Sequence, residues 1–443
     1  MTAESTIFAL ASAPGRAGVA VFRISGPLAK DALNLCRPSP QPKPREASLR
    51  KIHHPKSDEL IDQALVLWFA APNSFTGEDV VEFHTHGGRA VAQAMTEALR
   101  VQGFRMAEPG EFTRRAFENG CLDLTEAEAI ADLVHAETEA QRRQALHQFE
   151  GALGKMYEAW RARLLRSLAW LEAAIDFSDE DLPGDIAERQ TAELRVLVQE
   201  IAHHLDDKNR GERLREGFSV AILGPPNAGK SSLLNALARR DAAIVSATAG
   251  TTRDVIEVHL DLGGWPVVLA DTAGLRDSTG GIESEGIRRA LARAEQADLK
   301  LLIFDGAVWP TQDEATQKLI DERAIVIVNK ADVVANKASA PQNQAALFIS
   351  VKTGEGIPTL LEYLTHEIDV RFADTGAPPL TRARHRQALE ECQSHLERAL
   401  KDNAAELRAE DVRLAMRALG RMTGRVDVED LLDVIFRDFC IGK

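Results

Sequence analysis

The sequence predicts a multidomain protein, in which a small α+β domain precedes a discontinuous α-helical bundle and a doubly wound α/β domain is inserted into that bundle. Three observations predict this fold class. The chain has 443 residues, which exceeds the size of one ordinary domain. In its middle third, short apolar runs alternate with helical stretches, and long helical patterns flank that third on both sides. Hydrophobic residues make up 44% of the chain, enough for several buried cores.

Residues 1–118 have the pattern of the α+β domain. Short β-like runs alternate with helical stretches such as residues 90–100. Two loops, 13–18 and 74–79, combine turn-forming residues with charge, and we expect them to be binding loops. His84 and His86 could begin a metal site, but without a nearby cysteine or third histidine a surface strand is the preferred interpretation. The predicted strands are 7–11, 19–24, 64–69 and 80–83.

Helical patterns occupy residues 119–215 and 374–443. In the first segment, Thr125 and Glu128 have the spacing of a capping box, and an apolar stripe follows them. In the second, apolar residues recur at helical spacing after Pro379. We expect these stripes to form a core, so that the two segments pack as one discontinuous bundle.

Residues 216–373 lie between the helical segments and are predicted to form the inserted domain. Strand-like runs alternate there with helical stretches, which is typical of a doubly wound sheet. Such a sheet binds a nucleotide at the carboxyl ends of its strands. The predicted strands are Phe218–Leu223, 255–262, 267–271, Leu299–Asp305, Ala324–Asn329 and 346–350.

A phosphate-binding loop follows the first of these strands. Residues 224–231 read Gly-Pro-Pro-Asn-Ala-Gly-Lys-Ser, which has the form G-x-x-x-x-G-K-S. The glycines let backbone N–H groups converge on phosphate oxygens. Lys230 can neutralise β- and γ-phosphate charge, and the Ser231 hydroxyl can bind Mg²⁺. Residues 232–239 read as a helix whose N-terminus adds its dipole to the anion site.

Three further segments complete a guanine-nucleotide switch. They are Gly-Thr-Thr at 250–252, Asp-Thr-Ala-Gly at 271–274 and Asn-Lys-Ala-Asp at 329–332. The Asp332 carboxylate can accept the N1–H and 2-amino protons of guanine together, and Asn329 and Lys330 brace its loop. Adenine offers no such pair of donors. Binding ATP would therefore leave a desolvated carboxylate without hydrogen bonds, which costs about 1–3 kcal/mol. The sequence therefore predicts a Ras-like GTPase domain. The GTP-binding residues that these motifs predict are Asn227, Ala228, Gly229, Lys230, Ser231, Ser232, Gly250, Thr251, Thr252, Asp271, Thr272, Ala273, Gly274, Asn329, Lys330 and Asp332.

The residue after Asp-x-x-Gly bears on hydrolysis. Ras-like switches have a glutamine there that orients the attacking water, whereas this chain has Leu275. A leucine can neither orient a water nor stabilise charge, so another group or an ion must assist. Asn227 could hold a monovalent cation against the β- and γ-phosphates, in the role of an arginine finger. The alternative, that Asn227 only holds the loop, stays open.

Composition limits the classes of partner. The 53 basic and 67 acidic residues give a formal charge of −14, which argues against an extensive nucleic-acid-binding face but allows a local basic patch. The four cysteines (Cys36, Cys121, Cys392 and Cys440) lack metal-binding spacing, which suits a reducing cytosol. No signal peptide pattern and no apolar run near 18 residues is present, so we expect a cytoplasmic protein without a membrane span.

Several motifs together resemble one family along the whole chain. They are Pro-Asn-Ala-Gly-Lys-Ser at 226–231, Gly-Thr-Thr-Arg-Asp at 250–254, Leu275, Ser25-Gly26, Thr-Gly-Glu-Asp at 76–79, Pro-Gly-Glu-Phe at 109–112, Ala-Glu-Ala-Ile-Ala-Asp at 127–132 and the C-terminal Cys-Ile-Gly-Lys at 440–443. With these motifs the chain resembles the MnmE (TrmE) family of GTPases that modify tRNA wobble uridines. The C-terminal tetrapeptide combined with a phosphate loop is highly specific to that family.

The resemblance implies a potassium-activated GTPase that forms a homodimer. With a flavin-containing (FAD) partner, MnmG, in a heterotetramer, family members add an aminomethyl or carboxymethylaminomethyl group to C5 of the wobble uridine of certain tRNAs. The resemblance adds Ser246, Ala247, Thr248 and Ala249 to the GTP site. It implies that Ser231 and Thr252 bind Mg²⁺, and that Glu283 indirectly orients the attacking water. The implied K⁺ ligands are Asn227, Ser246, Thr248 and Thr251.

The resemblance also implies a folate site in an N-terminal folate-binding domain. The one-carbon donor would be a tetrahydrofolate derivative, 5-formyl- or 5,10-methylene-tetrahydrofolate. Its contacts would be Arg23, Glu78 and the C-terminal Lys443. The position after Asn119-Gly120 carries a basic residue in relatives, and here it is Cys121. Cys440 corresponds to the proposed active-site thiol, with an ordered tail and a packed cysteine as the alternative.

Two other classes share parts of this pattern. An RNA-binding ribosome-assembly GTPase would share the nucleotide motifs, but it predicts a basic module with a G-x-x-G loop after the switch, where this chain is helical. A membrane-remodelling GTPase predicts a basic amphipathic helix or an apolar span, and neither is evident.

Overall fold

The computed structural model describes residues 5–37, 40–176, 186–239, 257–271, 295–311, 313–334, 346–371, 378–401, 404–426, 429–437 and 439–442. The chain divides into two compact units. The first consists of Met1–Ala131, Gln148–Leu197 and Glu391–Lys443, and the second of Asp132–His147 and Val198–Glu390.

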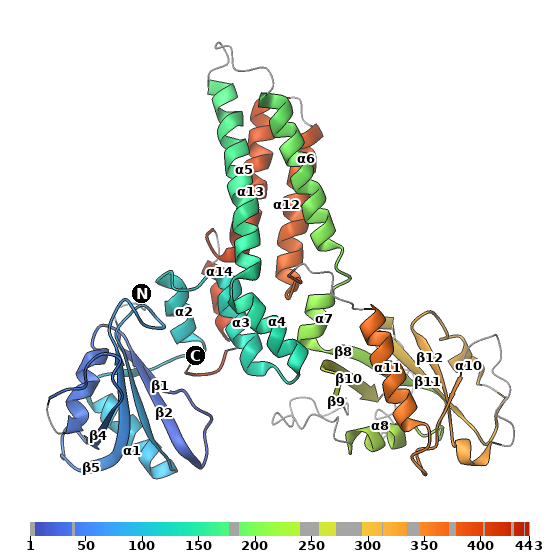
Figure 1. Ribbon diagram of the computed structural model, residues 1–443, viewed down its shortest axis with the longest axis horizontal. Helices are drawn as coiled ribbons and strands as arrows, with labels where there is room; N and C mark the ends of the chain where they lie inside the picture. The colour runs from blue at the N-terminus through green and yellow to red at the C-terminus, as the bar shows by residue number, and fades with distance from the viewer. Residues whose placement is uncertain are drawn as a thin grey trace, which may run out of the picture. The chain divides into compact units, whose positions relative to one another are not determined.

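The first unit contains a sheet that includes β1, β2, β4 and β5 (Figure 1). It has seven strands, in the order β3-β4-β5-β6-β2-β1-β7. All neighbours pair antiparallel except β1 and β7, which are parallel. Helix α1 (Arg89–Val101) lies against β5 and β6 and buries Met95, Ala98 and Leu99 in the core. The strands are β1 (Ile7–Leu10), β2 (Ala17–Ser25), β3 (Cys36–Arg37), β4 (Ser48–His53), β5 (Leu60–Phe69), β6 (Val80–Gly87) and β7 (Arg105–Met106).

Sequence patterns located four of these strands and missed β3, β4 and β7. Strand β4 reads Ser-Leu-Arg-Lys-Ile-His and buries only Ile52, so it carries too little apolar periodicity to be recognised. Strands β3 and β7 have two residues each, and only their pairing partners define them. A 3-10 helix (Ala29–Leu35) and α2 (Glu111–Glu118) complete this part of the unit.

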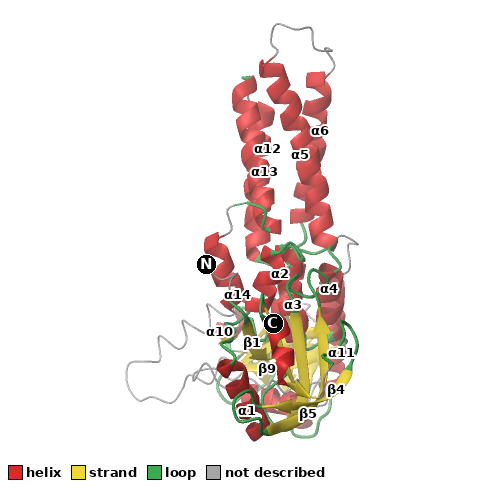
Figure 2. Ribbon diagram, turned by 90° about the vertical axis from the view of Figure 1, so that its left-hand side faces the viewer, coloured by secondary structure: helices red, strands yellow, loops and turns green. Residues whose placement is uncertain are grey.

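Helices from both sides of the α/β segment lie against one another in the first unit (Figures 1 and 2). Helix α5 (Ala152–Asp176) packs against α13 (Ala405–Thr423). Ion pairs join α5 to α6 (Ile186–Leu205) through Arg163 and Glu193, and α13 to α12 (Ala383–Lys401) through Arg421 and Glu391.

The last helix of this unit, α14 (Glu429–Arg437), packs beside α2. Phe436 and Phe439 are buried with ring centroids 5.2 Å apart, so they anchor the chain end. They pack with Leu124 and Ala127 of α3 (Leu124–His135), whose residues up to Ala131 belong to this unit.

The predicted capping box at Thr125 and Glu128 is wrong. The reciprocal pair is Asp123 with Glu126: the Glu126 N–H donates to Asp123 Oδ1 (2.9 Å), and the Asp123 N–H donates to Glu126 Oε2 (2.8 Å). Helix α3 begins at Leu124, so Thr125 already lies in the first turn, and both Thr125 and Glu128 are buried. An aspartate caps a helix as well as a threonine does, so the same spacing occurs two residues upstream.

The second unit contains a six-stranded sheet in the order β13-β12-β11-β8-β10-β9. Its strands pair in parallel except for the antiparallel hairpin of β9 and β10. This is the predicted doubly wound sheet, with α8 (Lys230–Ala238) after β8 and α11 (Ile357–Arg371) after β13. The strands are β8 (Phe218–Leu223), β9 (Glu257–Leu262), β10 (Trp265–Asp271), β11 (Leu299–Asp305), β12 (Ala324–Asn329) and β13 (Ala346–Phe348).

Strands β8, β11 and β12 have the predicted bounds, because each is an almost continuous buried apolar run. Strand β10 begins two residues earlier than predicted, and β13 ends at Phe348 rather than 350. Two short helical segments also lie between these strands along the chain, α10 (Glu314–Gln317) and a 3-10 turn at Ala331–Val333. Residues 255–256 lie outside the described part of the chain.

The second unit also includes helical segments next to the sheet: α4 (Glu139–Phe149), up to His147, and α7 (Arg210–Glu216). Asp132 Oδ1 accepts hydrogen bonds from Arg215 Nε (3.2 Å) and Arg382 Nη2 (2.7 Å). Arg215 stands just before β8 and Arg382 just before α12. One carboxylate therefore joins the segment that enters the α/β domain to the segment that leaves it.

Replacing Asp132 with alanine should destabilise the protein by about 2 kcal/mol, because two partly buried guanidinium groups lose their shared anion. The measurement is the midpoint of chemical denaturation followed by circular dichroism. Glu139→Ala is the matched control: Glu139 also pairs with two arginines, Arg142 and Arg143, and these hydrogen bonds lower its pKa to about 2. Those side chains are exposed and screened by solvent, so the midpoint should not move. Equal shifts for the two variants would contradict the bridging role.

Candidate functional site

The phosphate loop joins β8 to α8 at the carboxyl edge of the sheet. Gly224 and Gly229 have φ values of +148° and +98°, which L side chains rarely adopt. The Lys230 ammonium donates to the carbonyls of Gly224 and Pro225, both at 2.9 Å. Within the loop its charge therefore lies where phosphate oxygens could replace these two carbonyls, and the N-terminus of α8 faces the same way.

Asn329 ties the phosphate loop to the segment expected to read the base. Its side-chain amide Nδ2 donates to the Ala228 carbonyl (2.8 Å), and its Oδ1 accepts from the Val351 N–H (3.2 Å). Asn329 is buried, so these bonds are shielded from water. The amide fixes two loops from different strands in one arrangement.

Asp332 lies at the surface, held by a residue that sequence patterns did not single out. The Ser350 hydroxyl donates to Asp332 Oδ1 (2.7 Å) and lowers the pKa of that carboxyl. Lys330 pairs with Asp305 Oδ2 (2.6 Å), which steadies the same loop. A Ser-x-Lys string at 350–352 directly after the last strand was the signal that could have identified Ser350. The carboxylate is thus ionised and oriented, as recognition of two N–H donors requires.

Asn227 projects from the phosphate loop. It has a φ of +64°, which is uncommon for a residue other than glycine, and it is exposed. Among the described residues no hydrogen bond engages its side chain. The amide oxygen is therefore available to a cation or ligand.

Some predicted site residues lie outside the described part of the chain, and for Asp271 only the backbone is described, as the last residue of β10. Those outside are Ser246, Ala247, Thr248, Ala249, Gly250, Thr251, Thr252, Thr272, Ala273, Gly274, Glu283 and Lys443, and Leu275 lies there too.

The first unit gathers the residues expected at the folate site. Arg23, on β2, donates from Nε to Glu82 Oε1 (2.9 Å) and from Nη1 to the Gly442 carbonyl (3.3 Å). Its guanidinium carbon lies 5.6 Å from the ring centroid of Phe75 and 5.9 Å from that of Phe112. The cation thus lies near two aromatic faces, beside the C-terminal tail.

Glu78 belongs to a buried polar network in the same unit. Its Oε2 accepts from the Ser25 hydroxyl (2.7 Å), and both its oxygens accept from Arg115 Nη1 (3.2 and 3.1 Å). The Arg115 side chain is only 3% exposed and also bonds Glu111. Sequence patterns did not point to Arg115, because Glu78 stands 37 positions away from it along the chain. The network orients the Glu78 carboxyl through Ser25 and Arg115.

The C-terminal tail lies along the N-terminal sheet. Ile441 forms an antiparallel bridge with Pro109, and the Gly110 N–H donates to the Cys440 carbonyl (3.4 Å). Gly442 has a φ of +101°, and a Cβ there would come 2.7 Å from the Cα of Ala11. Only glycine therefore fits this approach.

Of the four cysteines, two are exposed and two are buried. Cys440 and Cys121 are exposed, and Cys121 lies beside the turn at Gly77. Burial raises the pKa of both Cys36 and Cys392 to about 12, so these thiols stay protonated. Cys121 and Cys440 are the thiols that can react.

His84 and His86 are paired with carboxylates rather than with each other. His84 Nε2 lies 3.2 Å from Glu82 Oε2, and His86 Nδ1 lies 2.8 Å from Asp62 Oδ1. Within the described ranges, no group of three or more His, Cys, Asp or Glu residues could hold a metal ion. Both histidines lie on β6 (Val80–Gly87), so the strand extends beyond its predicted end at residue 83.

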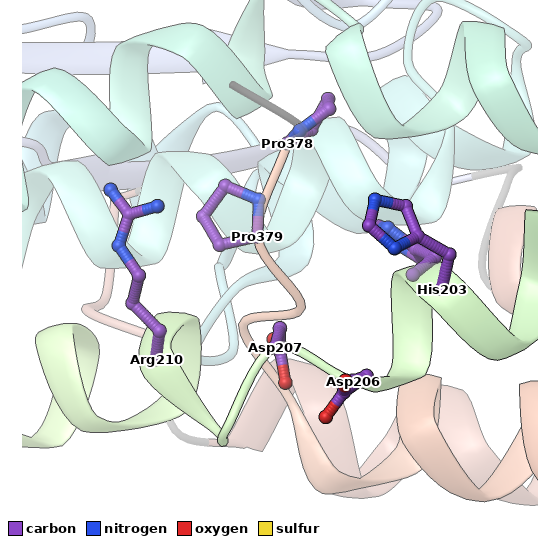
Figure 3. Close-up of a pocket in the computed structure, with 7 residues that line it drawn as sticks. His203, Asp206, Asp207, Arg210, Pro378 and Pro379 are labelled. Carbon is purple, nitrogen blue, oxygen red and sulfur yellow. The ribbon is translucent and has the colours of Figure 1, made fainter. Parts of the chain in front are cut away.

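A small cavity of about 30 Å³ lies in the second unit, where α6 ends (Figure 3). Burial lowers the pKa of His204 to about 4, so its imidazole is neutral. Asp207 accepts from Arg386 Nη2 (2.5 Å). The cavity has room for a water molecule but not for a nucleotide or a folate, and its lining is structural. The lining residues are His203, His204, Asp206, Asp207, Arg210, Pro378 and Pro379.

Comparison with known proteins identifies relatives of the whole chain. The family model described as MnmE helical domain matches residues 124–440, and the model described as GTP-binding protein TrmE N-terminus matches residues 6–121. A protein of Paramagnetospirillum magneticum named tRNA modification GTPase MnmE is 57% identical over 441 residues, covering 99% of this chain and 100% of the relative. A protein of the same name from Parvibaculum lavamentivorans is 56% identical over 443 residues, with 99% and 100% covered.

Several solved structures are similar to part of the chain. The G domain of the T. maritima FeoB iron transporter is 26% identical, covers 35% of this chain and 99% of its own, and has a TM-score of 0.26. Among the described residues, no helix is long and apolar enough to cross a membrane.

Gly229→Ala should weaken guanine nucleotide binding about 100-fold. The new Cβ would overlap Asn329 Nδ2, breaking a buried hydrogen bond, and an L residue at this φ adds strain. Affinity for a fluorescent guanine nucleotide measures the effect. Gly264→Ala is the control, since Gly264 has a φ of +94° but its Cβ would meet only Ala140 N at 4.0 Å. Unchanged affinity in Gly229→Ala would show that the loops are not arranged as described.

Proposed function

The chain belongs to the MnmE family of tRNA modification GTPases, and from this membership we propose that it is a potassium-activated GTPase that acts on the wobble uridine of certain tRNAs. The observation that carries the proposal is the full-length identity of 57% with a relative of that name. With the flavoprotein MnmG, in a heterotetramer, it adds an aminomethyl or carboxymethylaminomethyl group to uridine C5. It acts in the cytoplasm as a homodimer.

Nucleotide binding follows from the loops at the edge of the second sheet. Lys230 and the amides of the phosphate loop bind the phosphates, while Ser231 and Thr252 bind Mg²⁺. Asp332 reads guanine, supported by the Ser350 hydroxyl at 2.7 Å. We assign residues 216–373 to this GTPase domain and residues 119–215 and 374–443 to the helical domain.

Potassium supplies the charge that the side chain of Leu275 cannot. Asn227 is exposed in a left-handed conformation, and its side-chain oxygen is available for a monovalent cation beside the phosphates. Glu283 indirectly orients the attacking water. The proposed K⁺ ligands are Asn227, Ser246, Thr248 and Thr251.

The N-terminal domain, residues 1–118, binds a tetrahydrofolate derivative and mediates dimerisation. A bound folate of this class supplies the one-carbon unit, as 5-formyl- or 5,10-methylene-tetrahydrofolate. Arg23 and Glu78 fit such a ligand because each is oriented by an ion pair and keeps hydrogen-bonding capacity. Lys443 is the third proposed folate contact, and Cys121, at a position that is basic in other family members, is the fourth.

Cys440 is proposed as a nucleophile of the modification reaction. Its thiol belongs to the exposed part of the tail, while its carbonyl is held by the Gly110 N–H. A thiolate there could attack uridine or the one-carbon unit. The tail thus combines a fixed backbone with a free side chain.

GTP hydrolysis should be strongly stimulated by K⁺ and weak in Na⁺, because the smaller ion fits a site shaped for potassium poorly. The rate of phosphate release in matched chloride salts measures this. Hydrolysis should also rise with protein concentration if two GTPase domains complete the site. Asn227→Ala should lose the stimulation while its nucleotide affinity stays unchanged. Equal turnover of wild type in the two salts would refute the proposal.

Cells lacking this gene should lose the modification at C5 of the tRNA wobble uridine, as measured by mass spectrometry of tRNA nucleosides. The wild-type gene should restore it, and Cys440→Ser should restore it poorly while hydrolysing GTP at a nearly normal rate. Full restoration by Cys440→Ser would exclude a catalytic thiol. Normal tRNA with altered ribosomal subunit profiles in the deletion strain would favour the alternative of a ribosome-assembly GTPase.

A further inference from the structure

Arg23 and Glu82 form a cross-strand pair that none of the sequence motifs includes. The two residues are directly opposite in the antiparallel register of β2 and β6. Arg23 Nε donates to Glu82 Oε1 at 2.9 Å, and the two side chains are 21% and 14% exposed. The second oxygen of Glu82 lies 3.2 Å from His84 Nε2 on the same face of β6. The Glu82 carboxylate therefore contacts Arg23 through one oxygen and His84 through the other.

The ion pair with Glu82 determines which N–H donors of the Arg23 guanidinium remain for a ligand. A guanidinium has five N–H donors in a rigid fork. In the described part of the chain, Nε is used by Glu82 and one N–H of Nη1 by the Gly442 carbonyl. The remaining three N–H donors belong to the Nη1 and Nη2 end of the fork, which suits a carboxylate or a carbonyl of a ligand.

The same guanidinium holds the C-terminal tail. Arg23 is the side chain that donates to the Gly442 carbonyl (3.3 Å), while the other tail contacts are the Pro109–Ile441 bridge and the Gly110–Cys440 bond. Both of these backbone contacts are made by Pro109 and Gly110. Among the described residues of the tail, the hydrogen bond from Arg23 to Gly442 is therefore the restraint closest to the chain end.

We propose that Glu82 is a positioning residue, which fixes Arg23 so that one guanidinium can hold the C-terminal tail and face the folate at the same time. The folate part of this proposal rests on the proposed function, whereas the tail part rests on the contacts alone. Without Glu82 the arginine side chain keeps only its bond to the Gly442 carbonyl and its contacts with the two aromatic rings, so it samples more rotamers and presents its fork to the ligand less often. Glu82 itself does not touch the ligand.

A simple structural pair elsewhere in the sheet provides the matched control. Asp62, on β5, bonds His86 Nδ1 (2.8 Å) and the His86 N–H (2.7 Å) on β6, and its side chain is 10% exposed. This carboxylate joins neighbouring strands as Glu82 does, but its hydrogen bonds and ion pairs with described residues involve neither Arg23 nor the tail. Asp62→Ala therefore reports what the loss of any cross-strand carboxylate does to the sheet.

The first experiment measures affinity for 5-formyltetrahydrofolate by calorimetry. Glu82→Ala should bind about 10-fold more weakly than wild type, and Glu82→Gln, which keeps an acceptor for Nε, within about twofold of it. Asp62→Ala should match wild type. In an Arg23→Ala background, Glu82→Ala should add less than about twofold, because its effect passes through Arg23.

The second experiment follows the tail without any folate. The rate at which a maleimide labels Cys440 is measured by mass spectrometry of the peptide after Arg437, which separates it from the other exposed thiol, Cys121. Glu82→Ala should speed labelling of Cys440 about fivefold, as a loosened tail would, and leave Cys121 unchanged. Glu82→Gln and Asp62→Ala should label at the wild-type rate.

The two experiments test the folate site and the role of Glu82 separately. If wild type binds no folate, or Arg23→Ala binds it normally, the proposed folate site fails and the labelling result still decides the role of Glu82 at the tail. If folate binds through Arg23 but Glu82→Ala is normal in affinity and labelling, the positioning role is overturned. Should Glu82→Ala not fold, Arg23→Lys replaces it, since an ammonium cannot reproduce the fork to Glu82 and Gly442. Unchanged Cys440 labelling in that variant also overturns the proposal.

Discussion

The parallel register of β8, β11 and β12 is the constraint on which the nucleotide site depends. Because these strands run in one direction, the chain leaves all three at the same edge of the sheet. The backbone is packed so closely there that a Cβ at Gly224 would overlap the Ile303 carbonyl, and one at Gly306 would come 2.5 Å from the Asn329 carbonyl. The glycines are therefore required by the meeting of the strand ends as well as by a ligand.

The two candidate sites orient their polar groups by different means. At the nucleotide site, a neutral amide, Asn329, links loops through hydrogen bonds to backbone atoms. In the N-terminal domain the orienting contacts are ion pairs, Arg23 with Glu82 and Arg115 with Glu78. Largely buried charges need such partners to offset their desolvation. The pairing also lowers the entropic cost of ordering these side chains when a ligand binds.

Sequence patterns predicted the elements whose burial is continuous and missed those defined by distant partners. Leu299–Asp305 was predicted with its observed bounds because an almost wholly buried parallel strand is an apolar run. Strand β4 was missed because only Ile52 is buried. The capping box was misplaced by two residues because Asp123 and Thr125 both suit a helix N-terminus, and only the hydrogen bonds distinguish them.

The same distinction applies to the sites. The phosphate loop is a local string, so its residues could be named from sequence. The roles of Glu82, Arg115 and Ser350 depend on strand register and on contacts across 18 to 59 positions of chain, which no local pattern contains.

Asp132 is an intermediate case. It ends the motif at 127–132 that helped to identify the family, yet its partners, Arg215 and Arg382, are 83 and 250 residues away. Its carboxylate acts between the two segments that bound the α/β domain, and not in either candidate site. A residue pattern can therefore mark such a position as typical of a family without indicating what it does.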